Sequence, residues 1–351
     1  MRPRPEFRAE IQGLRIRFGQ EGQGVRLSFR HHRVAILHTP DMPRGARIHL
    51  VCIIEDALKR LGVDVVHLYG TDEFVPADLL FVHYDRSVVP PHIARFAKKY
   101  RRRINADARD IRKHTYADGL LTRNSTYDGR VIVKSTLNYG GQPEINSRSL
   151  LTRIRQKASR LAGLQDTPLI HSKQDYQIFE RLSDVPAPYF SQHHVVQKLL
   201  PEWDGEKNVL REYIFFGDIH FENIERSSDL IITEDENVSC RPFVPHPRLL
   251  EMREKLHLDY GKLDYTMIDG EPFIFDANKT LGLGEFVDTN SASTEYISML
   301  HAFALEIVRI VNDQEFRTYD ISRLHGARTP IPARRSRRQP SVQPAAKVQN
   351  G

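Results

Sequence analysis

Apolar runs and helical segments alternate over residues 34–104 and predict a small α/β unit. Short apolar runs typical of buried strands occur three times, as RVAILH, VDVVHLY and ADLLFVHYD. Two further segments have helical spacing, one with a glycine stop and one with a proline start. They are ARIHLVCIIEDALKRLG, ending at Gly62, and SVVPPHIARFAKKYRRR. Strands that alternate with helices are typical of a parallel sheet with crossover helices.

From Asn105 onward, the pattern favours antiparallel hairpins. Two segments each contain a pair of alternating runs around a Gly-Asp or Asp-Gly turn, NVLREYIFFGDIHFENIERS and KLDYTMIDGEPFIFDANKT. The other predicted elements are a helix in DARDIRKHTYADGLL, strands in RVIVKSTLNYGGQPE and HHVVQKLLPEWDG, and an amphipathic helix in TEYISMLHAFALEIVRIVNDQ. The fold class predicted for the chain is an α/β lobe followed by an α+β part.

Residues 142–190 give a less regular pattern. SLLTRIRQKASRLAG predicts a basic helix, and TPLIHSKQDYQIFERLSDVP is compatible with a second one. Two roles stay open for this segment: a mobile insertion over a site, or an element that packs against the rest.

Composition places the chain among ordinary globular proteins. Its 351 residues suffice for two or three packed units, with 40% hydrophobic and 27% charged residues. No apolar stretch approaches the roughly 20 residues that span a bilayer, and the N-terminus lacks the apolar core of a signal peptide. Cys52 and Cys240 are too few for a disulfide framework or a zinc cluster. No GxGxxG follows the first strand, so a dinucleotide site is not indicated. These features favour a cytoplasmic protein without membrane association.

The basic pI of 9.2 comes from the two ends of the chain. Residues 1–33 carry a net charge of +5 and residues 327–351 one of +6, which leaves about −5 for residues 34–326. The C-terminal stretch has the Pro, Gln, Ser and Ala content of a disordered segment. Its RRSRR could touch nucleic acid or anionic lipid, but a solubilising tail is the favoured interpretation. Nucleic acid is therefore not the expected partner of the folded part.

Lys134 is the first candidate for chemistry. It lies at the end of an apolar strand, where burying an ammonium without a partner is costly. The turn at Gly140 and Gly141, six residues later, would let backbone N–H groups approach an anion. Together they predict a phosphate cradle. The alternative is a lysine whose ammonium reaches the surface along its own aliphatic stem.

Asp264, Asp276 and Asn278 form the second candidate. On a strand, positions 276 and 278 share a face because side chains alternate with period two. If Asp269-Gly270 forms the hairpin turn, Asp264 lies near the level of residues 275 and 276. Two neighbouring carboxylates repel unless a cation lies between them, and Mg²⁺ prefers such oxygen ligands. The alternative is a solvated hairpin end with Asn278 capping the following turn.

With these motifs in this order, the sequence resembles the ATP-grasp superfamily, which includes D-alanine–D-alanine ligase, glutathione synthetase and ligases that add glutamate to ribosomal proteins. The resemblance covers residues 105 to about 284, with a looser match of residues 34–104 to the lobe before the ATP-grasp fold. It implies two lobes with the nucleotide between them. The implied organisation is a basic extension (1–33), a pre-ATP-grasp domain (34–104), an ATP-grasp domain (105–325, with lobes of about 114–200 and 201–325) and a disordered tail (326–351).

The resemblance also implies a role for each motif. The implied nucleotide contacts are Lys113, Lys134, Gly140, Gly141, the adenine hinge Gln197, Lys198 and Leu199, and a ribose contact at either Glu202 or Asp204. The implied catalytic residues are Arg211, facing the phosphates, and Lys262, and the implied metal ligands are Asp264, Asp276 and Asn278. The implied cofactors are ATP and one or two Mg²⁺ ions, for which Mn²⁺ could substitute.

Two departures weaken the inference to any one ligase. Many relatives carry Glu where this chain has Asp276, and several use Arg where it has Lys262, a point charge instead of a bidentate fork. The implied reaction is phosphorylation of a small-molecule or peptide carboxylate, followed by attack of an amine. The chain could also form a homodimer. An ATP-grasp kinase and a non-catalytic nucleotide-binding module remain alternatives.

Overall fold

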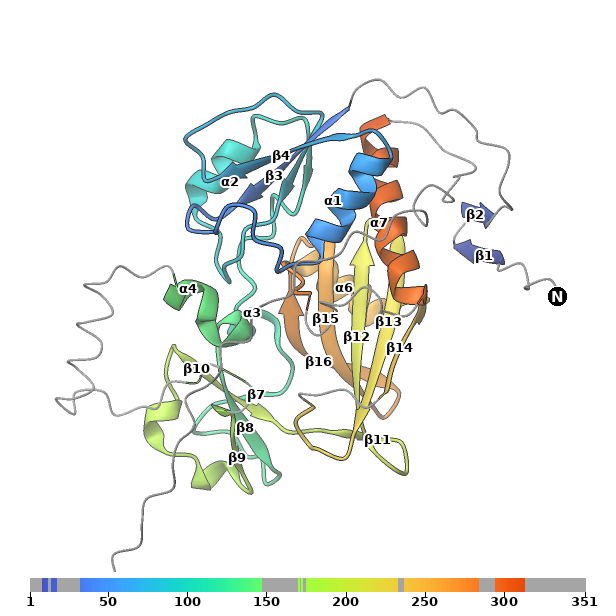
Figure 1. The fold of residues 1–351 in the computed structure, drawn as a ribbon. Coiled ribbons are helices and arrows are strands. Elements are labelled where there is room, and N and C mark those ends of the chain that lie inside the picture. The colour runs from blue at the N-terminus through green and yellow to red at the C-terminus, as the bar shows by residue number, and fades with distance from the viewer. Residues whose placement is uncertain are drawn as a thin grey trace, which may run out of the picture.

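The computed structural model describes residues 8–11, 14–17, 32–146, 170, 172, 175–232, 237–283 and 294–312. These residues form three larger sheets and a separate hairpin of β1 (Arg8–Ile11) and β2 (Leu14–Arg17) (Figure 1). The predicted disordered tail and most of the predicted insertion lie outside the described residues. None of the described helices is both long and apolar enough to cross a membrane.

The first sheet is all parallel, as predicted. Its order is β4 (Asp64–Tyr69), β3 (Arg33–His38), β5 (Leu79–Val82) and β6 (Arg102–Ile104), with crossover helices α1 (Val51–Arg60) and α2 (Pro91–Ala97). The helix expected to run through residues 101–103 instead ends at Ala97. A strand follows it because Ile104, only 4% exposed, adds to the apolar core beside β5.

The second, smaller sheet is antiparallel. Its order is β7 (Leu120–Leu121), β10 (His194–Lys198), β8 (Val131–Ser135) and β9 (Gln177–Phe179). Short helical turns surround it: α3 (Lys113–Tyr116), η1 (Asn138–Gly141), α4 (Gln142–Asn146), η3 (Leu182–Asp184) and η4 (Ala187–Tyr189).

The long helix predicted over residues 107–121 is wrong. Only the four residues of α3 are helical, because the backbone before them is bound elsewhere: Val89 donates to the carbonyl of Arg109, and Ile111 donates to that of Ser87. The predicted second helix of the insertion is also wrong where it is described, since β9 lies inside it.

The third sheet carries both predicted hairpins. Its order is β14 (Asn237–Pro242), β13 (Ile219–Ser227), β12 (Asn208–Phe216), β15 (Tyr260–Ile268) and β16 (Glu271–Asn278), and β11 (Glu202–Trp203) pairs with β12. Helices α6 (Pro247–Lys255) and α7 (Thr294–Asn312) complete this lobe. The predicted architecture, α/β followed by α+β, is thus confirmed, whereas β14 and α6 were not predicted.

The two faces of the third sheet belong to different cores. On one face, Phe216 and Tyr260 pack with α7 and α1, in the same core as Phe81 of the parallel sheet. Figure 1 shows α1 and α7 side by side over this face and α6 behind the sheet. On the other face, Tyr213 and Leu263 pack with α6. One of the cores therefore crosses the predicted boundary at residue 104.

Candidate active site

The two predicted metal-binding carboxylates lie directly opposite each other in neighbouring strands. Near the turn the ladder is regular, with Ile268 opposite Glu271, but the register shifts between Asp264 and Tyr265, and Asp264 then pairs with Asp276. In an unshifted ladder, Asp264 would lie opposite Phe275, and Asp276 would point to the other face. The β-bulge therefore brings the two carboxylates together.

A buried lysine neutralises Asp276. The ammonium of Lys113, whose side chain is 2% exposed, lies 2.9 Å from the Asp276 carboxylate and donates to the carbonyl of Leu137 at 3.3 Å. The hydroxyl of Tyr116 donates to the same carboxylate at 3.2 Å. Burial by itself raises the pKa of Asp276, but Lys113, helped by the charges of Lys134 and Lys262, more than offsets burial and holds this pKa below its usual range. Asp276 is therefore ionised at neutral pH.

Lys262 has the same relation to Asp264. Its ammonium lies 3.2 Å from the Asp264 carboxylate and also pairs with Glu212, which lies opposite Asp264 on β12. Burial lowers the pKa of Lys262, yet the two carboxylates more than offset this and raise it well above its usual value. Each predicted metal-binding carboxylate thus has one lysine ammonium beside it.

Asn278 lies beside the glycine turn. The side-chain amide of Asn138 donates to its Oδ1 at 2.9 Å, which joins η1 to the end of β16. Gly140 and Gly141 follow with φ of +61° and +75°, and a Cβ at Gly141 would come within 2.8 Å of the Leu137 side chain. Glycine is therefore needed to place this turn at the carboxylate end of the sheet.

Lys134 belongs to the wall of a pocket between the two antiparallel sheets. Its ammonium donates to Gln197 Oε1 at 2.9 Å and lies 4.7 Å from the ring centroid of Phe275. Gln197, only 1% exposed, donates its own N–H to the carbonyl of Asp118. Gln197 therefore fixes the orientation of Lys134 in the pocket wall. Both ends of the Gln197 amide are used, since its oxygen binds Lys134 and its N–H binds Asp118.

The pocket has an apolar end and a charged end. Its empty space is about 760 Å³, open solvent at the mouth included. The apolar part is lined by Ile132, Leu199, Leu200, Leu210, Leu230, Ile231 and Ile232, and the charged part by Lys134, Asp264 and Asp276. The predicted hinge residues Gln197, Lys198 and Leu199 all line it. Lys113, Gly140, Gly141, Lys262 and Asn278 lie at or behind the charged end without being part of its lining.

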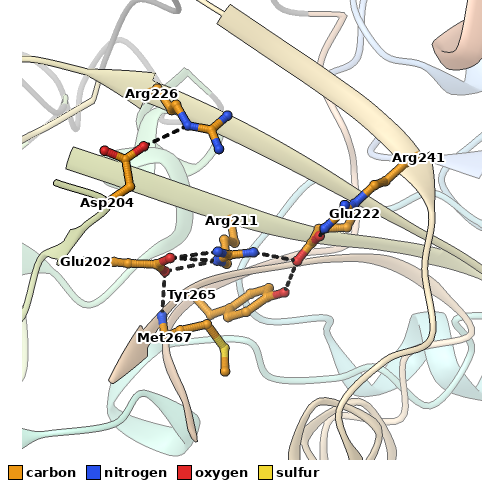
Figure 2. A network of polar contacts seen from close by, with 8 residues as sticks. All are labelled: Glu202, Asp204, Arg211, Glu222, Arg226, Arg241, Tyr265 and Met267. Atoms are coloured by element: carbon orange, nitrogen blue, oxygen red, sulfur yellow. Dashed lines mark hydrogen bonds and ion pairs between the residues drawn. The ribbon is translucent and has the colours of Figure 1, made fainter. Parts of the chain in front are cut away.

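Arg211 does not belong to this site, so the expectation that it faces the phosphates needs correction. It lies opposite Tyr265 in the ladder, whereas Asp264 pairs with the next residue of β12, so Arg211 points to the other face of the sheet. There it binds Glu202 with two nitrogens, at 2.7 and 2.9 Å, and Glu222 at 3.1 Å. Figure 2 shows this network around Arg211.

Neither ribose candidate reaches the pocket. Besides Arg211, Glu202 binds the backbone N–H of Met267 at 2.7 Å, and these bonds occupy its carboxylate. Asp204 accepts from the backbone of Glu206 and Lys207, as part of its own turn. It also accepts from Arg226 (Figure 2). Both acids stabilise the β11–β12 connection, and the geometry assigns the ribose contact to neither.

Three polar residues beside the carboxylates were missed by sequence reasoning. Glu212, Asn223 and Glu225 are all buried on the same face as Asp264. The Asn223 amide donates to Glu212 at 2.9 Å and to Glu225 at 3.3 Å. One signal was available: in REYIFF, Glu212 occupies the alternating position that Ile214 and Phe216 fill with buried apolar side chains.

The donor set fits a magnesium ion that arrives with phosphates. Asp264 and Asp276 offer two carboxylates, and Asn278 offers an amide oxygen at the same end of the sheet. Within the described ranges, no three His, Cys, Asp or Glu side chains gather as a metal-binding group. Mg²⁺ commonly takes one or two carboxylates and completes its shell with phosphates and water. The residues present fit that arrangement, and a closed protein cage is not needed.

Comparisons with known proteins find similarity in structure only. No protein-family model matches the sequence, and no curated protein does. The chain is similar to the macrocyclase MdnC from Microcystis aeruginosa MRC, bound with its precursor peptide MdnA, at 13% identity and a TM-score of 0.44, over 79% of this chain and 99% of that one. It is similar to a RimK domain ATP-grasp protein from Sphaerobacter thermophilus DSM 20745, at 12% identity and a TM-score of 0.41, over 78% of this chain and 99% of that one. It is also similar to the ATP-grasp ligase PsnB complexed with a minimal precursor, at 9% identity and a TM-score of 0.45, over 79% of this chain and 99% of that one. At TM-scores below 0.5, these similarities alone decide neither family nor activity.

Proposed function

We propose that this protein is an ATP-grasp enzyme that uses ATP and Mg²⁺ to join a carboxylate to an amine, through an acyl phosphate, with release of ADP and phosphate. The observation that carries the proposal is the pocket between two antiparallel sheets, apolar at one end and closed at the other by the opposed pair Asp264 and Asp276. An adenine ring suits the apolar end, and a magnesium-bound triphosphate suits the charged end.

Each part of the pocket has a separate task in this proposal. The base is held by Ile132 of β8, Leu210 of β12 and the apolar residues at 199–200 and 230–232, with the chain at Lys198 and Leu199 along its edge. Lys134, held by Gln197, places its charge on the phosphates. Asp264, Asp276 and Asn278 hold the magnesium ion, which when bound neutralises phosphate charge. Phosphoryl transfer depends mainly on such positioning and charge neutralisation.

Two lysines supply the remaining positive charge. Lys113 and Lys262 lie against the carboxylates and are not themselves part of the pocket lining. Lys113 keeps the Asp276 carboxylate ionised, and the ammonium groups of both lysines counter the charge that develops on the transferring phosphoryl group. The substrate of the proposed reaction is a small-molecule or peptide carboxylate, and the glycine turn beside Asn278 borders the place where it would be phosphorylated.

The test is ADP release measured with candidate acids and amines, each alone and in pairs, together with analysis of the products. A ligase releases ADP at full rate only when both substrates are present, and it forms an amide. A stable phosphorylated product formed without any amine would identify a kinase instead. Nucleotide binding without ADP release, across a panel of acids and amines, would argue for a binding module and against the proposal.

A further inference from the structure

The strand next to the proposed metal site carries a carboxylate that no motif predicted. Glu212 on β12 lies opposite Asp264 on β15, and the ammonium of Lys262 pairs with both. The residue is buried, at 9% exposure. A carboxylate in such a place needs a compensating partner, because an uncompensated buried charge is strongly destabilising.

The Glu212 carboxylate is itself held in place. Asn223, 2% exposed, lies opposite it on β13 and donates its amide N–H to Glu212 Oε2 at 2.9 Å. Because that bond comes from a neutral amide, it orients the carboxylate without neutralising it. The charge of Glu212 is therefore directed at Lys262.

We infer that Glu212 is a positioning residue that keeps the Lys262 ammonium from occupying the Asp264 oxygens that the proposed magnesium ion needs. This inference rests on the proposed function and extends it. If Lys262 had Asp264 as its only carboxylate partner, that ion pair would compete directly with Mg²⁺ for the Asp264 oxygens. With Glu212 present, the Lys262 ammonium keeps a carboxylate partner when Asp264 binds the metal. Replacement of the ammonium by Mg²⁺ at Asp264 therefore leaves no buried charge uncompensated.

The inference predicts coupling between residues 212 and 262 that a general charge effect would not produce. Removing any nearby carboxylate weakens cation binding somewhat. If Glu212 acts through Lys262, however, its removal should matter much less once Lys262 is also gone, which a double-mutant cycle measures. Glu225 on β13 provides a matched control, since it is a buried carboxylate bound to the same Asn223.

The experiment titrates MgCl₂ into the full-length protein with ADP present and follows ADP binding by calorimetry, so that no turnover is involved. Glu212→Gln should raise the Mg²⁺ concentration needed for half-saturation on the order of tenfold, and Glu225→Gln by less than about threefold. In a Lys262→Gln background, Glu212→Gln should have an effect below about threefold. Equal effects in both backgrounds, or equal effects of the two glutamate variants, would overturn the inference.

Two further measurements keep the outcomes separate. Thermal unfolding of each variant shows whether it is folded, and Glu212→Asp keeps the charge at nearly the same place. Glu212→Asp should recover part of the lost Mg²⁺ affinity, and a folded Glu212→Asp as weak as Glu212→Gln would contradict the positioning role. If the wild-type protein shows no Mg²⁺-dependent ADP binding, the proposed function fails first and this inference fails with it.

Discussion

The ammonium of Lys113 lies 2.9 Å from the carboxylate of Asp276, and this contact joins α3 to the end of β16. Lys113 is almost fully buried, and its ammonium also donates a 3.3 Å hydrogen bond to the carbonyl of Leu137. The pair therefore has two effects at once: it stabilises the junction between the lobes and keeps a proposed metal ligand ionised.

Replacing Asp276 by Asn should remove most turnover but leave nucleotide binding measurable. The apolar end of the pocket and Lys134 do not depend on Asp276, whereas the charge that holds magnesium does. The variant should also lose about 3 kcal/mol of stability, because Lys113 keeps its charge without an anionic partner. Urea denaturation measures the second effect and ADP release the first.

The double variant Lys113→Met with Asp276→Asn separates the two effects. It should recover much of the lost stability, since no buried charge is then left alone, but it should not recover turnover. Normal turnover in the Asp276→Asn variant would remove Asp276 from the proposed metal site.

Replacing Lys134 by Ala should weaken ATP binding on the order of ten- to a hundredfold, because a charge-assisted contact to phosphate is lost. Lys134→Arg should lose less, since it keeps the positive charge. Calorimetry on both variants measures the difference. Lys99→Ala is a suitable control, because Lys99 also lies over an aromatic ring, at 5.0 Å from the Phe96 centroid, but in the parallel-sheet lobe. Unchanged ATP affinity in Lys134→Ala would remove Lys134 from the site.

Replacing Arg211 by Met should lower stability by about 2 kcal/mol without changing ATP affinity. Arg211 bridges two carboxylates on the face of the sheet away from the pocket, and Glu222 is only 2% exposed there. Arg226→Met is the matched control: it breaks the more exposed pair with Asp204 and should leave the stability almost unchanged. A selective loss of ATP affinity in Arg211→Met, with stability intact, would restore the phosphate role that the sequence implied.

A group of histidines in the parallel-sheet lobe should make stability depend on pH. His83 is fully buried, and within the described residues neither of its ring nitrogens has a hydrogen-bond partner. Burial, and then the neighbouring His49 and His38, hold the pKa of His83 well below its usual value, and burial lowers the pKa of His38 to about 4. In the unfolded chain His83 and His38 take up protons below about pH 6.5. The unfolded state then binds more protons than the folded one, so stability falls as pH decreases from about 6.5 towards 4.

Replacing His83 by Phe should therefore reduce this acid sensitivity. A phenyl ring fits among aromatic neighbours and needs no hydrogen bonds, so stability at pH 7 should change little or rise slightly. Between pH 7 and pH 5, the loss of stability should be smaller than in the wild-type protein by about 2 kcal/mol. Urea denaturation at the two pH values tests this, with the exposed His92→Gln as a control for the loss of an imidazole. An undiminished pH dependence in His83→Phe would show that the other buried groups account for it.

Local patterns predicted much of this fold because they reflect local physics. The turns Gly217-Asp218 and Asp269-Gly270 set the two hairpins, and the alternation around them set which residues point inward. The pairing of Asp264 with Asp276 followed approximately from the second turn. The β-bulge that makes the pairing direct left no signal in the sequence, because it depends on how neighbouring strands pack.

The errors in the site have a similar cause. Arg211 and Glu212 are neighbours in REYIFF, and a one-residue ambiguity along a strand exchanges the two faces of the sheet. The motif suggested the arginine, whereas the ladder places the glutamate beside Asp264. In the same way, the four-residue α3 was overestimated because the hydrogen bonds that hold the backbone before it come from residues 87–89, which are distant in sequence.

The shared core of the parallel sheet and the third sheet determines which parts of the molecule can move. The rings of Phe81 and Tyr260, from these two sheets, have centroids 5.1 Å apart, and Phe216 and Phe303 surround them. Pulling these sheets apart would expose several aromatic side chains to water, a cost of several kcal/mol. The smaller sheet has its own separate core, and polar contacts such as the hydrogen bond from Asn138 to Asn278 join its side of the molecule to β16. Any opening of the pocket should therefore be a rotation of the smaller sheet about the chain at residues 199–201, while the parallel sheet and the third sheet stay together.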